Sequence, residues 1–400
     1  MFINKYTLFP SNLYQLTLIV SLVSLLRGEV TINPNNFIFL CSQYLSLVLM
    51  TILLGSVLHK YSFRWQLIIV FFVLLSLYVG FINQRGIEMY ATCAFIFGAK
   101  GEKYEDVLRY YFSVSLFFCV SIIILNRMGL VRESLTAPMG REGIFTDESV
   151  VRHSFGYVWS TDFATHVFFI LLTYWILRKG KIGKLFSLIY LIIVFLIIKY
   201  SDARLGAGSI LLLVVASFYL YLRKRFMAKK TFPKSYKLVV IWIPFLFLLI
   251  YYLTIWYDDA NTNAVILNLL LSGRLSISQD AIREYGIKMF GQYYIQYGGT
   301  SSKIYYNFID SSYLQLLVIY GIIYTICYVG AYVYLTYKAY KRKDEVLLIA
   351  ILIAGFTGAI SQHFIQIYMN PILIALFTNH IYRLNVPSQK DITLPAGGTK

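Results

Sequence analysis

Apolar runs that are long enough to cross a lipid bilayer recur along almost the whole chain. A transmembrane helix needs about 20 mostly apolar residues. Stretches that approach this length lie at 13–26, 37–58, 66–82, 87–99, 107–126, 161–177, 183–199, 205–222, 237–256, 312–336, 345–363 and 368–382. The sequence therefore predicts an all-α polytopic membrane protein with about 12 transmembrane helices.

Composition excludes the other broad classes of protein. Hydrophobic residues make up 58% of the 400 residues and charged residues only 14%, whereas about a quarter of a soluble domain is charged. A water-soluble fold cannot hide so much apolar surface, because the buried fraction is limited by chain length. The net charge of +17 would suit nucleic acid only if it formed one basic patch. The basic residues fall instead in short clusters between apolar runs, so we expect no nucleic-acid partner.

The distribution of charge predicts the orientation in the membrane. With both termini in the cytoplasm, 24 of the 36 Lys and Arg residues but only 6 of the 19 Asp and Glu residues face inward, as the positive-inside rule requires. Long outer loops then lie at about 127–160 and 257–311, and apolar stretches in the second predict amphipathic helices on the outer surface. We expect one transmembrane catalytic domain over 1–385 and a disordered cytoplasmic tail over 386–400.

Familiar metal and nucleotide motifs are missing from the sequence. The four cysteines lie inside apolar segments without CxxC spacing, which indicates packing rather than a zinc site. There is no D-x-D, GxxxxGK or HExxH sequence. We therefore predict no metal and no cofactor.

Arginines at the outer boundary of the membrane are the most informative charges. The positive-inside rule disfavours them there, and one arginine alone is explained by a side chain that reaches lipid headgroups. Five occupy such positions, namely Arg27, Arg85, Arg152, Arg204 and Arg274. The last three lie in polar, glycine-containing stretches, which favours a ligand-binding role.

Four short stretches carry a resemblance to a known family. They are RHSFGYVWSTDFA (Arg152–Ala164), SDARLG (Ser201–Gly206), SGRLSISQDA (Ser272–Ala281) and DSSYLQLLVIYG (Asp310–Gly321). In their order, and in the predicted topology, the chain resembles the Wzy-type repeat-unit polymerases of bacterial surface polysaccharide and, more distantly, the O-antigen ligases. The resemblance spans most of the chain, although the motifs themselves cover only about forty residues.

The resemblance implies a GT-C-like, metal-independent glycosyltransferase in the bacterial cytoplasmic membrane. Its donor and its acceptor would both be oligosaccharide units linked to undecaprenyl diphosphate, and its product would be O-antigen, capsule or exopolysaccharide. The family's outer-face arginines map onto Arg152, Arg204 and Arg274, which would bind the diphosphate. Arginine suits this role because it forks onto phosphate oxygens and keeps its charge. Besides membrane lipids, a chain-length regulator and a flippase are the partners that the resemblance suggests.

The acceptor hydroxyl needs a group that takes its proton. The ligases have a histidine where this chain has Asp310, and this difference favours the polymerase branch. Asp310 is the first candidate for the catalytic base and His363 the second. A purely structural reading of Asp310, at a helix N-terminus with Ser311 as cap, is equally open. A glycan ligase and a lipid-linked oligosaccharide flippase or exporter remain the alternative functions.

Overall fold

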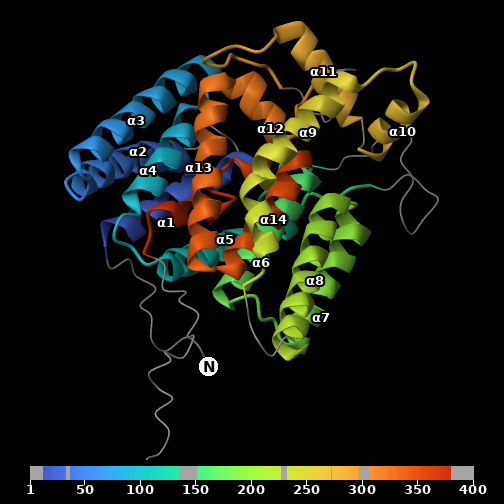
Figure 1. Ribbon diagram of the computed structural model, residues 1–400, viewed down its shortest axis with the longest axis horizontal. Coiled ribbons are helices and arrows are strands. Elements are labelled where there is room, and N and C mark those ends of the chain that lie inside the picture. The colour runs from blue at the N-terminus through green and yellow to red at the C-terminus, as the bar shows by residue number, and fades with distance from the viewer. Residues whose placement is uncertain are drawn as a thin grey trace, which may run out of the picture.

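The structure is a computed structural model that describes residues 12–32, 37–134, 151–226, 232–271, 273–296 and 307–379. Within these ranges the chain is helical and forms no β-sheet; two isolated β-bridges, Val30–Tyr157 and Lys103–Asn379, are the extended pairings. Much of the first predicted outer loop (135–150) and the predicted tail (386–400) lie outside the described residues. The helices pack as one bundle around a continuous apolar core (Figure 1).

Eight helices of the described part are long and apolar enough to cross a membrane. They are α2 (Phe37–Leu58), α3 (Phe63–Asn83), α5 (Tyr104–Arg127), α6 (Ser160–Leu177), α7 with the π-helix η2 (Lys184–Leu196 and Ile197–Ser201), α8 (Arg204–Phe226), the 3-10 helix η3 with α9 (Lys234–Ile241 and Trp242–Trp256), and the run from α12 to α13 (Ser312–Arg342). Shorter helices at three further predicted positions are α1 (Leu13–Leu26), α4 (Gly86–Gly98) and α14 (Glu345–Ile360). The prediction of a polytopic helical membrane protein is confirmed.

The last predicted helix, over 368–382, is wrong in the part that the structure describes. In its place lies a short 3-10 helix, η6 (Pro371–Leu376). Asn370 precedes it, and the Asn370 side chain accepts a hydrogen bond from the Ile372 amide. Pro371 has no amide hydrogen, so it cannot continue a helix that begins before it. The Asn370 side-chain Nδ2 also donates to the Phe364 carbonyl. A capped turn therefore replaces the helix that apolar composition predicts.

The predicted helix over 312–336 is interrupted near Gly321. It consists of α12 (Ser312–Gln315), the π-helix η4 (Leu316–Tyr320) and α13 (Gly321–Arg342). Gly321 has φ of +87°, and a Cβ there would lie 2.1 Å from the Gly291 nitrogen. At this close approach of the two backbones, the Ile322 amide donates a hydrogen bond to the Lys288 carbonyl. The interruption thus anchors the second outer loop to the bundle.

The second predicted outer loop contains the helices that its apolar stretches predict. They are α10 (Thr262–Leu270), which Asn261 caps, and α11 (Arg274–Tyr285). Figure 1 shows both at one end of the bundle, beyond α9, whereas α7 and α8 form a pair at its edge. The loop is therefore folded where the structure describes it, and it covers the end at which the predicted site residues lie.

Candidate functional site

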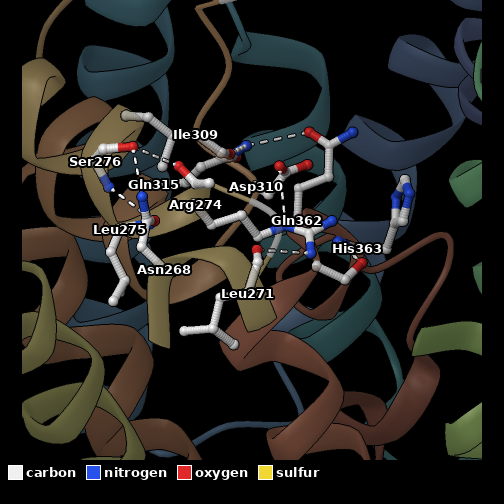
Figure 2. Close-up of polar contacts among 12 residues, drawn as sticks. Asn268, Leu271, Arg274, Leu275, Ser276, Ile309, Asp310, Gln315, Gln362 and His363 are labelled. Atoms are coloured by element: carbon white, nitrogen blue, oxygen red, sulfur yellow. Dashed lines mark hydrogen bonds and ion pairs between the residues drawn. The ribbon is translucent and has the colours of Figure 1, made fainter. Parts of the chain in front are cut away.

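Arg274 and Asp310 face each other at the end of the bundle covered by α10 and α11. The Arg274 Nε donates a hydrogen bond of 3.0 Å to Asp310 Oδ2, and Arg274 Nη1 lies 3.4 Å from the Leu271 carbonyl oxygen. About a fifth of each side chain of the pair is exposed. Figure 2 shows that the pair lies in the middle of a larger group of polar contacts. The structure thus brings together two residues that the sequence singled out separately.

The turn before α11 is built to present Arg274. Gly273 caps the helix with φ of +79°, a conformation that few other residues adopt. Asn268 fixes the far side of the turn, because its Oδ1 accepts the Leu275 amide at 3.0 Å and its Nδ2 donates to Ser276 Oγ at 3.0 Å (Figure 2). The position of the guanidinium is therefore determined by backbone contacts as well as by its carboxylate partner.

Arg152 and Arg204 belong to a second group, around the turn at residues 201–204. Arg152 Nε donates to the Ser201 carbonyl at 2.9 Å, and Arg204 Nε donates to Asp202 Oδ1 at 3.0 Å. Asp202 has a left-handed φ of +42°. The Arg204 side chain is 44% exposed, whereas that of Asp202 is 3% exposed. Arg152 thus binds backbone, while Arg204 presents its charge at the surface.

The N-terminal turn of α6 connects the two arginine groups. A Cβ on Gly206, two residues after Arg204, would lie 2.8 Å from the Cβ of Ala164, so α8 and α6 are in close contact there. Asp162, in the same turn of α6, has its Oδ1 3.0 Å from His363 Nε2, and the neighbouring Gln362 accepts a hydrogen bond from Gln315 of α12. All four stretches that carry the family resemblance therefore meet at this end of the bundle.

His363 lies next to this group but is buried. Only 1% of the residue is exposed, and its Nε2 lies 3.0 Å from Asp162 Oδ1, while its Nδ1 contacts Gln366 Oε1. It belongs to the 3-10 helix η5 (Gln362–Phe364), beyond the end of α14. Since both ring nitrogens have partners, the assignment of His363 as a base stays a prediction, with Asp310 as the more accessible candidate.

Glu29 completes a buried polar cluster with His363 and Asp162. It ends the 3-10 helix η1 (Arg27–Glu29) and accepts hydrogen bonds from Tyr368 Oη at 2.7 Å and Gln366 Nε2 at 3.2 Å. Burial, together with the nearby Asp162 carboxylate, raises the pKa of Glu29. Burial lowers the pKa of His363, but its hydrogen bond and ion pair with Asp162 outweigh that effect and raise the pKa to about 9.

Arg85 links the polar cluster to the second outer loop. Its Nη2 donates to Gln296 Oε1 at 2.8 Å, and its Nη1 lies 3.3 Å from the Tyr320 hydroxyl and 3.4 Å from Gln315 Oε1. The Gln315 side-chain Nε2 in turn donates to Gln362 Oε1 at 3.1 Å, a contact drawn in Figure 2. Arg85 therefore holds the second outer loop against α12 and η4, a role that its position in the sequence did not predict.

A cavity of about 20 Å³ lies beside Arg274. Its lining includes Ser278, Ser311 and the apolar side chains of Leu275 and Leu314. This volume is about that of one water and is too small for a sugar ring. A glycan would therefore have to lie on the open side of the Arg274–Asp310 pair.

Sequence reasoning missed the roles of Glu29 and Asp162 at this end of the bundle. Asp162 is an acidic residue in the first turn of α6, where the helix dipole alone favours a carboxylate. The one signal is that each carboxylate lies at the end of an apolar segment, close to the depth at which ionisable residues become costly. Their separation along the chain hid the fact that they meet.

Comparisons with protein-family models, with curated proteins and with solved structures gave no match to this chain.

Proposed function

We propose that the chain is a polymerase that joins undecaprenyl-diphosphate-linked oligosaccharide repeat units into a surface polysaccharide. The observation that carries the proposal is the contact between Arg274 and Asp310 at 3.0 Å. These residues come from two different stretches of the family resemblance, 36 positions apart. Such a reaction needs a cation that stabilises the leaving diphosphate and a base that accepts the proton of the acceptor hydroxyl. A guanidinium in contact with a carboxylate supplies both groups.

The leaving group of this reaction is a lipid diphosphate. The acceptor hydroxyl oxygen forms a bond to the anomeric carbon of the growing chain, the bond from that carbon to the diphosphate oxygen breaks, and the electron pair stays on the diphosphate. Arg274 would stabilise the negative charge that develops there. Its Nε is held by Asp310, and its Nη2 makes no hydrogen bond to a described residue, so this edge of the guanidinium is open to phosphate oxygens.

Asp310 would accept the proton that the acceptor hydroxyl loses. The carboxylate is partly exposed, so a hydroxyl can reach it, and its pairing with Arg274 fixes its direction. Arg204 would add a second charge toward the diphosphate from the 201–204 turn, and Arg152 would hold that turn in place. His363 is the second candidate base.

A groove on the side of the bundle supports a lipid-linked substrate. It has a volume of about 380 Å³ between α3, α4 and α13, and most of its lining is apolar, with Phe72, Ile96, Tyr324 and Leu373 among the lining residues. A prenyl chain could lie there while its diphosphate stays at the polar end. In this proposal the polar end faces the outside of the cytoplasmic membrane and both termini face the cytoplasm.

The glycan profile of a deletion strain tests the function. We expect the strain to lose long chains and to keep a single repeat unit on its surface, and the wild-type gene should restore the long chains. Loss of all surface sugar would identify an exporter instead. Accumulation of finished polymer on the lipid carrier, without transfer to a final acceptor, would identify a ligase. Either of the last two results would overturn the polymerase proposal.

A further inference from the structure

Three side chains from distant parts of the sequence form a buried site with ligand groups suited to a metal ion. They are Glu29 from η1, Asp162 from the first turn of α6 and His363 from η5. One carboxylate oxygen of each acid and one ring nitrogen of the histidine all lie within 4.8 Å of one another. The residues are 8%, 2% and 1% exposed, in that order. Buried carboxylates need a compensating charge, which a partner or a metal can supply.

The charges around the site favour a bound cation. Glu29 and Glu88 both interact electrostatically with Arg85, and Asp162 lies close enough to Glu29 to repel it. With all three carboxylates ionised, Arg85 balances one negative charge and a divalent ion would balance the other two, whereas protonation of His363 would balance only one.

One oxygen of the cluster has no partner. Asp162 Oδ1 contacts His363, but Asp162 Oδ2 is buried and forms no hydrogen bond in the described structure. A buried carboxylate oxygen without a donor is costly. Coordination of a cation would satisfy it.

The surroundings of His363 resemble the outer shell of a metal site. Metal-bound histidines usually donate the other ring N–H to an oxygen that fixes the tautomer. Here Nδ1 contacts Gln366 Oε1, which leaves Nε2 directed at the carboxylates. Gln366 Nε2 and the Tyr368 hydroxyl also donate to Glu29. These residues therefore orient two of the three ligands.

We propose that Glu29, Asp162 and His363 bind a divalent transition-metal ion. Two carboxylates and one imidazole suit Zn²⁺, Mn²⁺ or Fe²⁺, whereas Mg²⁺ and Ca²⁺ prefer oxygen ligands alone. The ion would tie the end of α1, the start of α6 and the 361–370 segment together beneath the Arg274–Asp310 pair. This site goes beyond the proposed function and does not depend on it, because the diphosphate is assigned to arginines elsewhere. A metal-bound His363 would leave Asp310 as the base.

Metal analysis of the purified protein tests this site. The full chain is purified in detergent without chelator and its metal content is measured by mass spectrometry; we expect about one Zn²⁺, Mn²⁺ or Fe²⁺ per chain. After treatment with EDTA the protein should unfold at a lower temperature, and Zn²⁺ or Mn²⁺ should restore the original midpoint, with Mg²⁺ much less effective. Reconstitution with Co²⁺ should give the absorption bands of a cobalt–histidine complex.

Variants locate the ion within the chain. Asp162→Asn and Glu29→Gln should lower metal content about tenfold or more, and Gln366→Ala should weaken binding about tenfold because it loosens His363. The matched control is Asp344→Asn, another buried carboxylate, which caps α14 and can still cap it as asparagine. Asp344→Asn should keep the metal.

Two results would overturn the metal site. The first is wild-type protein that is folded and monodisperse but contains no transition metal and shows no shift in its unfolding temperature with Zn²⁺ or Mn²⁺. In that case a protonated His363, together with a proton on one of the carboxyl groups, balances the cluster. The second is metal that stays at full occupancy in folded Asp162→Asn and Glu29→Gln protein, because the ion would then be bound elsewhere. Neither result bears on the polymerase proposal.

Discussion

The Arg274–Asp310 pair and the 201–204 turn lie at the same end of the bundle, yet they use arginine differently. Arg274 contacts a carboxylate that is itself partly open to solvent. Arg152 instead donates to a backbone carbonyl, and the partner of Arg204 is a buried aspartate two residues before it. The sequence treats the three arginines as equivalent diphosphate ligands. Within the proposed function, the difference in their partners suits three roles: a central charge for Arg274, a structural role for Arg152 and an exposed auxiliary charge for Arg204.

The largest effect is expected for Arg274→Ala. Loss of a charge that stabilises the leaving diphosphate should reduce chain extension about 100-fold or more. Protein abundance should change little, because partly exposed ion pairs contribute about 1 kcal/mol or less to stability. Polymer length on a gel, normalised to the amount of membrane protein, is the measurement.

Two further variants sharpen that result. Arg274→Lys keeps the charge but cannot fork onto phosphate, so it should recover only part of the activity. Arg283→Ala removes an exposed arginine from the same helix and should leave chain extension unchanged. Normal polymer length in Arg274→Ala would show that the guanidinium has no part in the reaction.

The contact between α6 and α8 tests whether the two arginine groups form one site. Gly206→Val places side-chain atoms against Ala164, where even a Cβ would be 2.8 Å from its neighbour. Overpacking of this kind costs about 1–3 kcal/mol, and α8 should shift away from α6. We expect a lower unfolding temperature and weaker chain extension.

Gly208→Val is the matched control for that variant. It lies on the same helix, and a Cβ there would meet no atom within 4 Å. If Gly206→Val behaves like Gly208→Val in both stability and activity, the two groups do not depend on the helix contact.

Arg152→Ala should affect stability more than chemistry. It removes a charged hydrogen bond to the Ser201 carbonyl, and such bonds contribute about 1.5–3 kcal/mol. Unfolding in detergent should occur at a lower temperature, while chain extension per folded molecule should fall much less than in Arg274→Ala. Equal loss of activity in the two variants would mean that Arg152 also contacts the diphosphate.

The smallest effect is expected for Arg204→Ala. Its side chain is 44% exposed, so the fold should change little, and the charge should mainly assist binding of the lipid-linked donor. A rise in KM of a few-fold with little change in kcat is the expected pattern for an interaction made equally in the ground and transition states. A fall in kcat alone would place Arg204 beside Arg274 in importance.

Much of the fold follows from the sequence, because a bilayer leaves helices as the main solution for long apolar runs. The helices begin and end close to the predicted positions for runs such as 161–177 and 205–222, where charges or glycines mark the ends. Apolar composition alone does not predict the conformation at positions where a local contact determines it. At Asn370 and Pro371 a capped turn replaces the predicted helix. At Gly321 the helix is interrupted because the backbone at Gly291 packs directly against it.

The candidate site was only partly predictable for a different reason. Arg274 and Asp310 stand out because each lies in a polar stretch between apolar runs, and the structure pairs them. Glu29, Asp162 and His363 have no common spacing, and only the packing of α1, α6 and η5 brings them together. Local sequence reveals a polar residue at a helix end, but tertiary packing decides its partner.

Reconstitution of the purified protein tests the central claim most directly. The full chain in lipid vesicles is supplied with undecaprenyl-diphosphate-linked repeat unit as the only sugar substrate, and the products are separated by size. We predict a ladder of longer glycans together with release of undecaprenyl diphosphate in wild-type protein, and neither in Arg274→Ala. Folded wild-type protein that leaves every repeat unit unextended, or a ladder of equal length from Arg274→Ala, would contradict the central role assigned to this pair.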